Sequence, residues 1–254
     1  MASYLVPGFP ATLFEVLADR LGAELVLESC GSGPDPGHDP FRDGTYDLGW
    51  ICAPSYVDLN RAPEPSVRLV GAAWVPDDPA AQGQPVYFSD LVAAPDCEAD
   101  SLADLSGLRI GCNDHMSLSG NHALQIALRE RGEDPGGFAD LIFTGGHQTS
   151  LDLLLTGELD AAVIDSIVRI ARARREPEVA ALRVVERLGP WPVQALVART
   201  DMAGAEVEAL CGRLLAVAAE PEVERQLHAA GLLGFVTIGD DHFEPVRAAL
   251  ADQV

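Results

Sequence analysis

Apolar residues follow two different spacings along this chain, and their alternation predicts strands and helices in turn. Segments rich in apolar and β-branched or aromatic residues at 4–6, 24–29, 45–52 and 67–75 predict short strands. After the first run, apolar positions three and four residues apart predict a helix; they are Leu13, Phe14, Leu17, Ala18 and Leu21. The first third of the chain therefore has the strand–helix units of an α/β fold.

Three further units of strand, polar turn and helix lie in the middle of the chain. Strands are predicted at residues 109–113, 140–144 and 159–165, and each precedes turn-forming residues and then apolar positions at helical spacing. Consecutive units of this kind predict a parallel sheet. Ligands of such sheets bind beyond the carboxyl ends of the strands, so we expect the functional site at that edge.

The polar turns at this edge have the composition of an anion-binding site. Ser117 and Ser119 supply hydroxyl donors, Gly120 allows close approach to the backbone, and a helix N-terminus presents N–H groups and positive charge. The other two turns carry His147, after two glycines, and Asp165. Simple helix caps explain Ser119 and Asp165 equally well, and a loop histidine without a role explains His147. The convergence of three turns favours a ligand site.

Two extended segments predict a division into two lobes. A strand at residues 86–93 follows a proline-rich break, and a turn at 189–192 precedes a strand at 193–199, which we expect beside 86–93. Two such crossings predict a hinge. Lobe 1 then comprises residues 1–85 plus 198–254, and lobe 2 comprises residues 86–197 and carries the anion site.

Composition excludes several classes of function. The 254 residues are 48% hydrophobic, which predicts a globular protein with a full core. A net charge of −22 argues against nucleic acid or an anionic membrane surface as partner. An apolar stretch of about 18 residues, which a membrane span needs, is missing, as is the pattern of a signal peptide. We expect a cytoplasmic protein as the sequence stands, or a periplasmic or cell-surface one if a leader was removed.

The sequence offers little support for a metal or cofactor site. The six histidines and five cysteines show no metal-ligand spacing, and the cysteines are expected to be reduced. Neither a Gly-x-Ser-x-Gly elbow nor a dinucleotide fingerprint occurs. Aromatic residues of the predicted strands and turns either wall a ligand or belong to the core; they are Tyr4, Trp50, Tyr56 and Tyr87. We therefore expect no cofactor and no metal.

Several of these runs resemble the phosphate/phosphonate-binding proteins of ABC transporters. The most specific part is the ordered set Ser117-Leu-Ser-Gly120, Thr144-Gly-Gly-His147 and Ala161-Ala-Val-Ile-Asp165-Ser166. The likeness covers roughly residues 47–243. It implies a type II periplasmic-binding fold, in which two α/β lobes with mixed sheets, flanking helices and a two-strand hinge close on a ligand without catalysis.

The resemblance also implies roles for individual residues and partners. Ser117, Ser119 and His147 would hold the phosphonate or phosphate oxygens, with Gly120 and Thr144 in the same turns. Asp165 and the aromatics Tyr56 and Tyr87 would face the rest of the ligand. A small anion and an ABC permease are the expected partners of a monomer. The alternative is a cytosolic enzyme of the same fold that acts on a small carboxylate or phosphorylated anion, similar to chorismate dehydratase.

Overall fold

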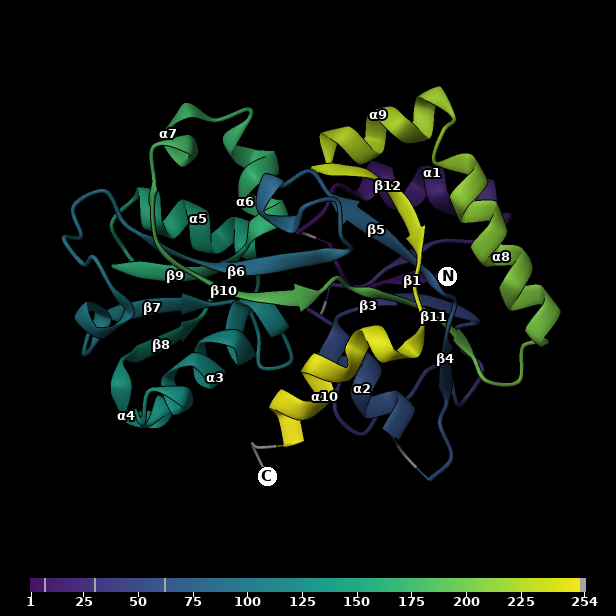
Figure 1. Cartoon of the computed structure of the whole chain (residues 1–254), viewed down its shortest axis with the longest axis horizontal. Helices are drawn as coiled ribbons and strands as arrows, with labels where there is room; N and C mark the ends of the chain where they lie inside the picture. The colour runs from purple at the N-terminus through teal and green to yellow at the C-terminus, as the bar shows by residue number, and fades with distance from the viewer. Residues whose placement is uncertain (7, 30, 62, 252–254) are drawn as a thin grey trace. The chain divides into compact units, whose positions relative to one another are not determined.

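The computed structural model describes residues 1–6, 8–29, 31–61 and 63–251. The chain divides into two compact units (Figure 1). Unit 1 consists of Met1–Val86 and Trp191–Val254, and unit 2 consists of Tyr87–Pro190. The predicted lobes, 1–85 plus 198–254 and 86–197, stay a prediction about which residues move together when a ligand binds.

Unit 1 contains a five-stranded mixed sheet and a separate two-stranded sheet. The strand order of the larger sheet is β2-β1-β3-β11-β4. Its strands are β1 (Ala2–Ser3), β2 (Val26–Leu27), β3 (Leu48–Ile51), β4 (Val67–Leu69) and β11 (Ala195–Arg199). Strand β1 is parallel to β2 and β3, whereas β11 is antiparallel to β3 and β4. The smaller sheet pairs β5 (Ala72–Pro76) with β12 (Leu232–Thr237) in antiparallel fashion.

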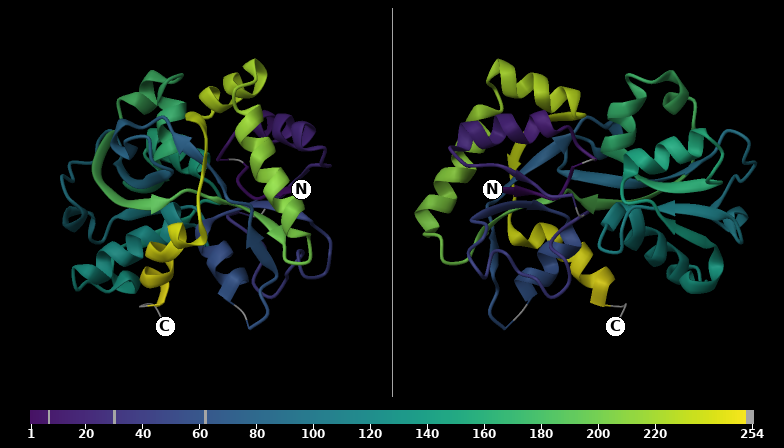
Figure 2. Two further views of the ribbon diagram at one scale, coloured as in Figure 1. Left: turned by 45° about the vertical axis from the view of Figure 1, so that its right-hand side comes forward. Right: turned by 180° about the vertical axis from the view of Figure 1, so that it is seen from behind.

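The helices of unit 1 form two groups (Figures 1 and 2). The first group is α1 (Ala11–Leu21), α8 (Gly204–Val217) and α9 (Pro221–Ala229), and α8 and α9 pack on β12. The second group is α2 (Ala53–Arg61) and α10 (Glu244–Ala251), which contact each other. Short 3-10 turns occur at η1 (Pro79–Ala81) and η4 (Asp240–Phe243). The apolar stripe predicted for the first helix is confirmed, because all five of its members are buried in α1.

Unit 2 contains one five-stranded mixed sheet with the order β10-β6-β9-β7-β8. Its strands are β6 (Val86–Ala93), β7 (Arg109–Cys112), β8 (Asp140–Phe143), β9 (Ala161–Asp165) and β10 (Arg183–Pro192). Strands β9, β7 and β8 are parallel neighbours, and β6 runs antiparallel to β9. The carboxyl ends of three successive strands therefore meet at one edge of the sheet.

Helices cover both faces of the unit 2 sheet (Figure 1). One face carries α3 (Ala123–Glu130) and α4 (Pro135–Phe138), and the other carries α5 (His147–Leu155), α6 (Ser166–Ala173) and α7 (Pro177–Ala180). A 3-10 turn, η2 (Leu102–Leu105), precedes β7, and a π-helical turn, η3 (Leu118–His122), precedes α3. The second face is closed by a core that includes Val92, Leu151, Leu154, Ile164 and Val179.

Several sequence expectations about strands were wrong. The run 67–75 forms two strands, because Gly71 has a φ of 88° and interrupts the extended backbone. The first strand is Ala2–Ser3 rather than residues 4–6. Residues 189–192 are not a turn but the end of β10, which is an edge strand and so tolerates prolines that lack an N–H donor. The strand beside β6 is therefore β10, whereas β11 joins the sheet of unit 1.

The cysteines of the described residues, Cys52, Cys97, Cys112 and Cys211, form no disulfide bonds, and their reduced state stays a prediction. The fifth cysteine, Cys30, lies outside the described residues. Burial raises the pKa of the Cys112 thiol to about 12, so this side chain is an uncharged core residue at neutral pH.

Candidate functional site

The two predicted serines lie in the turn between β7 and α3. Ser117 is the N-cap of η3, and its Oγ accepts a hydrogen bond of 3.0 Å from the backbone N–H of Gly120. The side chains of Ser117 and Ser119 are both buried, with 2% of each residue exposed. The helix-capping serine of this turn is thus Ser117, so a cap does not explain Ser119.

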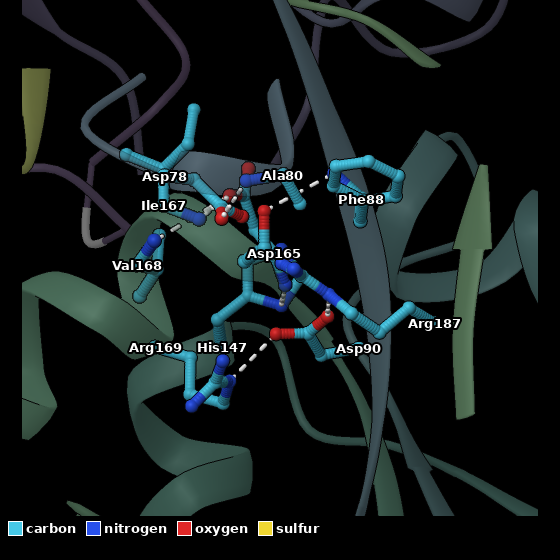
Figure 3. A network of polar contacts seen from close by, with 11 residues as sticks. Asp78, Ala80, Phe88, Asp90, His147, Asp165, Ile167, Val168, Arg169 and Arg187 are labelled. Carbon is cyan, nitrogen blue, oxygen red and sulfur yellow. Dashed lines mark hydrogen bonds and ion pairs between the residues drawn. The ribbon is translucent and has the colours of Figure 1, made fainter. Parts of the chain in front are cut away.

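Three turns from neighbouring strands meet at Ser119, His147 and Asp165. The Oγ of Ser119 lies 3.4 Å from Nε2 of His147. The backbone N–H of Asp165 donates to Nδ1 of the same ring across 3.4 Å (Figure 3). The carboxyl ends of β7, β8 and β9 thereby supply one connected set of polar groups within unit 2. Their contact with a ligand stays a prediction.

His147 is an uncharged group at the start of α5. Only 7% of the residue is exposed, and burial lowers the pKa of its imidazole to about 4, although a backbone hydrogen bond at Val163 acts in the opposite direction. The ring is therefore neutral at pH 7, with one nitrogen as donor and the other as acceptor. The position at a helix N-terminus disfavours the protonated ring further. Polarity at the centre of this site comes from neutral groups.

Thr144 and Gly120 shape the turns around His147. The hydroxyl of Thr144 lies 2.6 Å from Oγ of Ser150 and donates to the carbonyl of Cys112 across 3.0 Å, which holds the turn that precedes α5. A Cβ at Gly120 would lie 2.3 Å from Cβ of Asn113 and 3.0 Å from Cε1 of His147. The room left by the missing side chain of Gly120 is thus filled by protein atoms.

Asp165 acts as the N-cap of α6. Its carboxylate accepts hydrogen bonds from the backbone N–H groups of Ile167 at 2.8 Å and Val168 at 3.4 Å (Figure 3). The residue is buried, with 1% exposed. The cap that the sequence offered as an alternative is therefore present, and the predicted contact of Asp165 with the ligand stays a prediction.

Two serines of unit 2 that sequence reasoning missed support the same turns. Ser89 of β6 donates its hydroxyl to the backbone carbonyl of Ser119. Ser166 accepts a hydrogen bond of 3.1 Å from the backbone N–H of Phe88. Both serines are fully buried. For Ser89 the available signal was a hydroxyl within a predicted buried strand, since such a group requires a partner inside the protein.

The two predicted tyrosines are core residues of different units. Tyr87 belongs to β6 of unit 2 and has no exposed surface. Tyr56 belongs to α2 of unit 1, where its ring packs edge-on against Phe243 at 4.7 Å and its hydroxyl donates to Asp240. Burial and this hydrogen bond raise the pKa of Tyr56 above its ordinary value. Their role as a wall for the ligand stays a prediction.

A buried ion network lies beside the turns of unit 2. The carboxylate of Asp90, with no exposed surface, accepts a hydrogen bond of 2.6 Å from Nε of Arg169 and another of 2.6 Å from Nε of Arg187 (Figure 3). The Arg187 guanidinium also lies 4.4 Å from the centroid of the Phe88 ring. Sequence reasoning missed this network because its arginines are 79 and 97 residues from Asp90.

The described part of the chain also bears on metal binding and on membrane insertion. No group of three or more His, Cys, Asp or Glu side chains there is arranged to hold a metal ion. Among the described helices, none combines the length and apolar character that crossing a membrane requires.

Comparison with known families decides the class of protein. A family model described as "ABC transporter, phosphonate, periplasmic substrate-binding protein" matches residues 11–243. The chain belongs to this phosphonate-binding family. Members of the phosphonate-binding family are periplasmic substrate-binding proteins, so a small-molecule ligand and a permease are partners of the class. No curated protein matches the chain.

Solved structures share the fold of this phosphonate-binding family member across nearly its whole length. A binding protein component of an ABC phosphonate transporter from Pseudomonas aeruginosa has a TM-score of 0.79 and 18% identity, over 99% of this chain and 85% of that chain. PhnD1 from Prochlorococcus marinus, in complex with methylphosphonate, has a TM-score of 0.77 and 17% identity, over 99% and 96%. The aliphatic sulphonate binding protein SsuA from Escherichia coli has a TM-score of 0.64 and 14% identity, over 99% and 89%. The fold is that of type II periplasmic binding proteins.

Proposed function

We propose that this protein captures a phosphonate or phosphate ester at the strand ends of unit 2, with Ser117, Ser119 and His147 as donors to its oxygens. The observation that carries the proposal is the chain of contacts from Ser119 through His147 to Asp165, in a member of the phosphonate-binding family. The similar structure of PhnD1 was solved with methylphosphonate, which is a ligand of this chemical class.

The hydrogen-bond pattern of these turns suits an oxyanion. Ser117 accepts a bond from the Gly120 N–H, and its own hydroxyl proton can then go to a ligand oxygen. His147 begins α5, whose N-terminus carries positive partial charge from aligned peptide dipoles. Neutral donors and helix dipoles can thus hold an anion without a lysine or arginine in contact with it.

Several features favour a binding protein over an enzyme. A general base works best when its pKa lies near the working pH, whereas the pKa of His147 is lowered to about 4. Asp165 meets His147 through its backbone N–H, while its carboxylate caps α6, so the pair differs from a serine–histidine–aspartate triad. The enzyme alternative predicts conversion of the ligand, and the binding proposal predicts its recovery unchanged.

The proposal extends to the partner and the place of action. We infer a monomer that works outside the cytoplasmic membrane and delivers its ligand to an ABC permease, because the family consists of periplasmic substrate-binding proteins. Analytical ultracentrifugation with and without ligand checks the monomer. Cell fractionation of the producing organism checks the location, and recovery of the protein with the cytoplasm would contradict it.

Titration calorimetry with methylphosphonate and inorganic phosphate tests the central proposal. Ser119→Ala should weaken binding by about tenfold, because a hydrogen bond to a charged group is lost. Ser106→Ala is a matched control in unit 2, since Ser106 is exposed and precedes β7 at the opposite end of the strand. Unchanged affinity in Ser119→Ala, or phosphorus NMR that shows conversion of the ligand, would contradict the proposal.

A further inference from the structure

An exposed aromatic pair stands at the end of β8 in unit 2. Phe143 is one of four large hydrophobic residues that are exposed in the described part of the chain, with 40% of its surface accessible. Its ring lies against the imidazole of His115, with the centroids 3.9 Å apart and the planes inclined by 39°. His115 is exposed as well. The two rings pack against each other, and both leave aromatic surface exposed to solvent.

The same loops that carry the candidate anion donors hold this pair. Phe143 is the last residue of β8 and precedes the Thr144 to His147 turn, while His115 lies two residues before Ser117. The backbone around His115 is fixed, because its carbonyl accepts a bond of 2.9 Å from Asn121. The surface is therefore positioned by the turns that form the candidate site.

The sheet order places Phe143 on the strand next to the one that leads into the serine turn. Strand β8 is the edge strand next to β7, whose following turn carries the serines, and Cys112 of β7 is in register with Phe143. Neighbouring strands lie about 4.8 Å apart. A ring attached directly to a phosphoryl group is about as wide as this separation, so a ligand held over the end of β7 can extend to the end of β8.

The opposite direction along the rim is less suited to a ligand tail. There Asp165 has 1% of its surface exposed, and its carboxylate already accepts two backbone N–H groups of α6. An aromatic surface, in contrast, stabilises a bound planar group by stacking on it and removing it from water. The exposed surface at Phe143 and His115 is thus the better candidate for contact with the organic part of a ligand.

We propose that His115 and Phe143 form a second subsite that receives a planar apolar substituent of the ligand. The protein would then prefer aryl phosphonates or aryl phosphate esters to methylphosphonate. This inference rests on the proposed function, because it places the phosphoryl group at Ser117, Ser119 and His147. It adds the part of the ligand that gives specificity.

Titration calorimetry with phenylphosphonate and methylphosphonate tests the subsite. The unaltered protein should bind phenylphosphonate about tenfold more tightly, as expected for one stacked ring. Phe143→Ala should reduce this ratio to near one and change methylphosphonate affinity less than about twofold. Phe143→Tyr keeps the ring and should keep the preference. Leu233→Ala, which removes another exposed hydrophobic side chain in unit 1, is the control and should change neither affinity.

The possible failures are distinguishable. Equal affinity of the unaltered protein for both ligands, or a preference that survives Phe143→Ala, would overturn the subsite and leave the proposed function intact. Failure of either ligand to bind the folded protein would overturn the proposed function and the subsite together. Loss of methylphosphonate binding in Phe143→Ala, with an unchanged melting temperature, would overturn the assignment of Phe143 to the organic part of the ligand.

Discussion

Replacing Asp90 by asparagine should destabilise unit 2 more than the loss of an exposed ion pair would. Asp90 has no exposed surface, and the side chains of Arg169 and Arg187 are 16% and 30% exposed. Removing one partner of a buried ion pair costs about 3 to 5 kcal/mol, because the remaining charge stays desolvated. Since both arginines retain some access to water, we expect the lower end, about 3 kcal/mol.

Amide hydrogen exchange read by mass spectrometry is the suitable assay. It reports the free energy of opening segment by segment, so the loss should appear in peptides from β6, β10 and α6. Peptides from β3 and β5 serve as the internal control, because these strands, which contain Trp50 and Trp74, belong to unit 1. The loss in unit 2 should persist at high salt, since a buried pair is screened little.

An exposed ion pair of unit 2 provides the control with which Asp90→Asn is compared. Asp100 lies 2.9 Å from Arg183, and its side chain is 89% exposed. Such surface pairs contribute little to stability, so Asp100→Asn should change hydrogen exchange only slightly. If Asp90→Asn changes the exchange of unit 2 no more than Asp100→Asn does, the network is not a major source of stability and the reasoning from burial fails.

Two further predictions concern the turns of the candidate site. The pKa of His147 falls from 6.5 to about 4 on folding, so its neutral form contributes stability above pH 6.5 that is lost as the pH falls toward 4. A full pKa shift of this size amounts to about 3 kcal/mol of folding stability. In acid unfolding monitored by circular dichroism, His147→Gln should therefore lose less stability between pH 6.5 and 4 than the unaltered protein does. Gly120→Ala should lower the free energy of unfolding by about 1 to 3 kcal/mol, because its Cβ would meet Asn113 at 2.3 Å. Its control is Gly212→Ala in α8, where a Cβ would meet nothing within 4 Å. The control substitution should stabilise the helix, because alanine has a higher helix propensity than glycine. A Gly120→Ala protein with unchanged stability and ligand affinity would contradict the packing argument.

Local sequence patterns predicted most of the helices and strands, whereas they did not predict which strands pair with each other. The apolar spacing predicted the helix that carries Leu13 to Leu21, because burial of one helix face requires this period, and the apolar run predicted the strand at 86–93. The pattern of an apolar strand does not specify its neighbour, so β11 was expected beside β6 although it joins the sheet of unit 1. Likewise the run 67–75 appeared continuous, since periodicity takes no account of the positive φ of Gly71.

The candidate site was predictable only as a set of turns. Strand ends and polar turns identified Ser119, His147 and Asp165, which the structure brings into one series of contacts. The support from Ser89 and the network around Asp90 depend on tertiary pairing across tens of residues, which no local pattern encodes. The steric need for Gly120 likewise became visible only with its neighbours in place.

The π-helical turn η3 constrains how the length of this chain can vary. One turn of η3 contains a residue more than an α-helical turn, and the backbone N–H of His122 accordingly bonds to the carbonyl of Ser117. Loss of one residue here would rotate α3 by about 100° relative to the serines. The buried face of α3, with Leu124 and Leu128, would then no longer meet the sheet while the serines kept their positions. Relatives that share this site should therefore keep the number of residues between the serines and α3 unchanged.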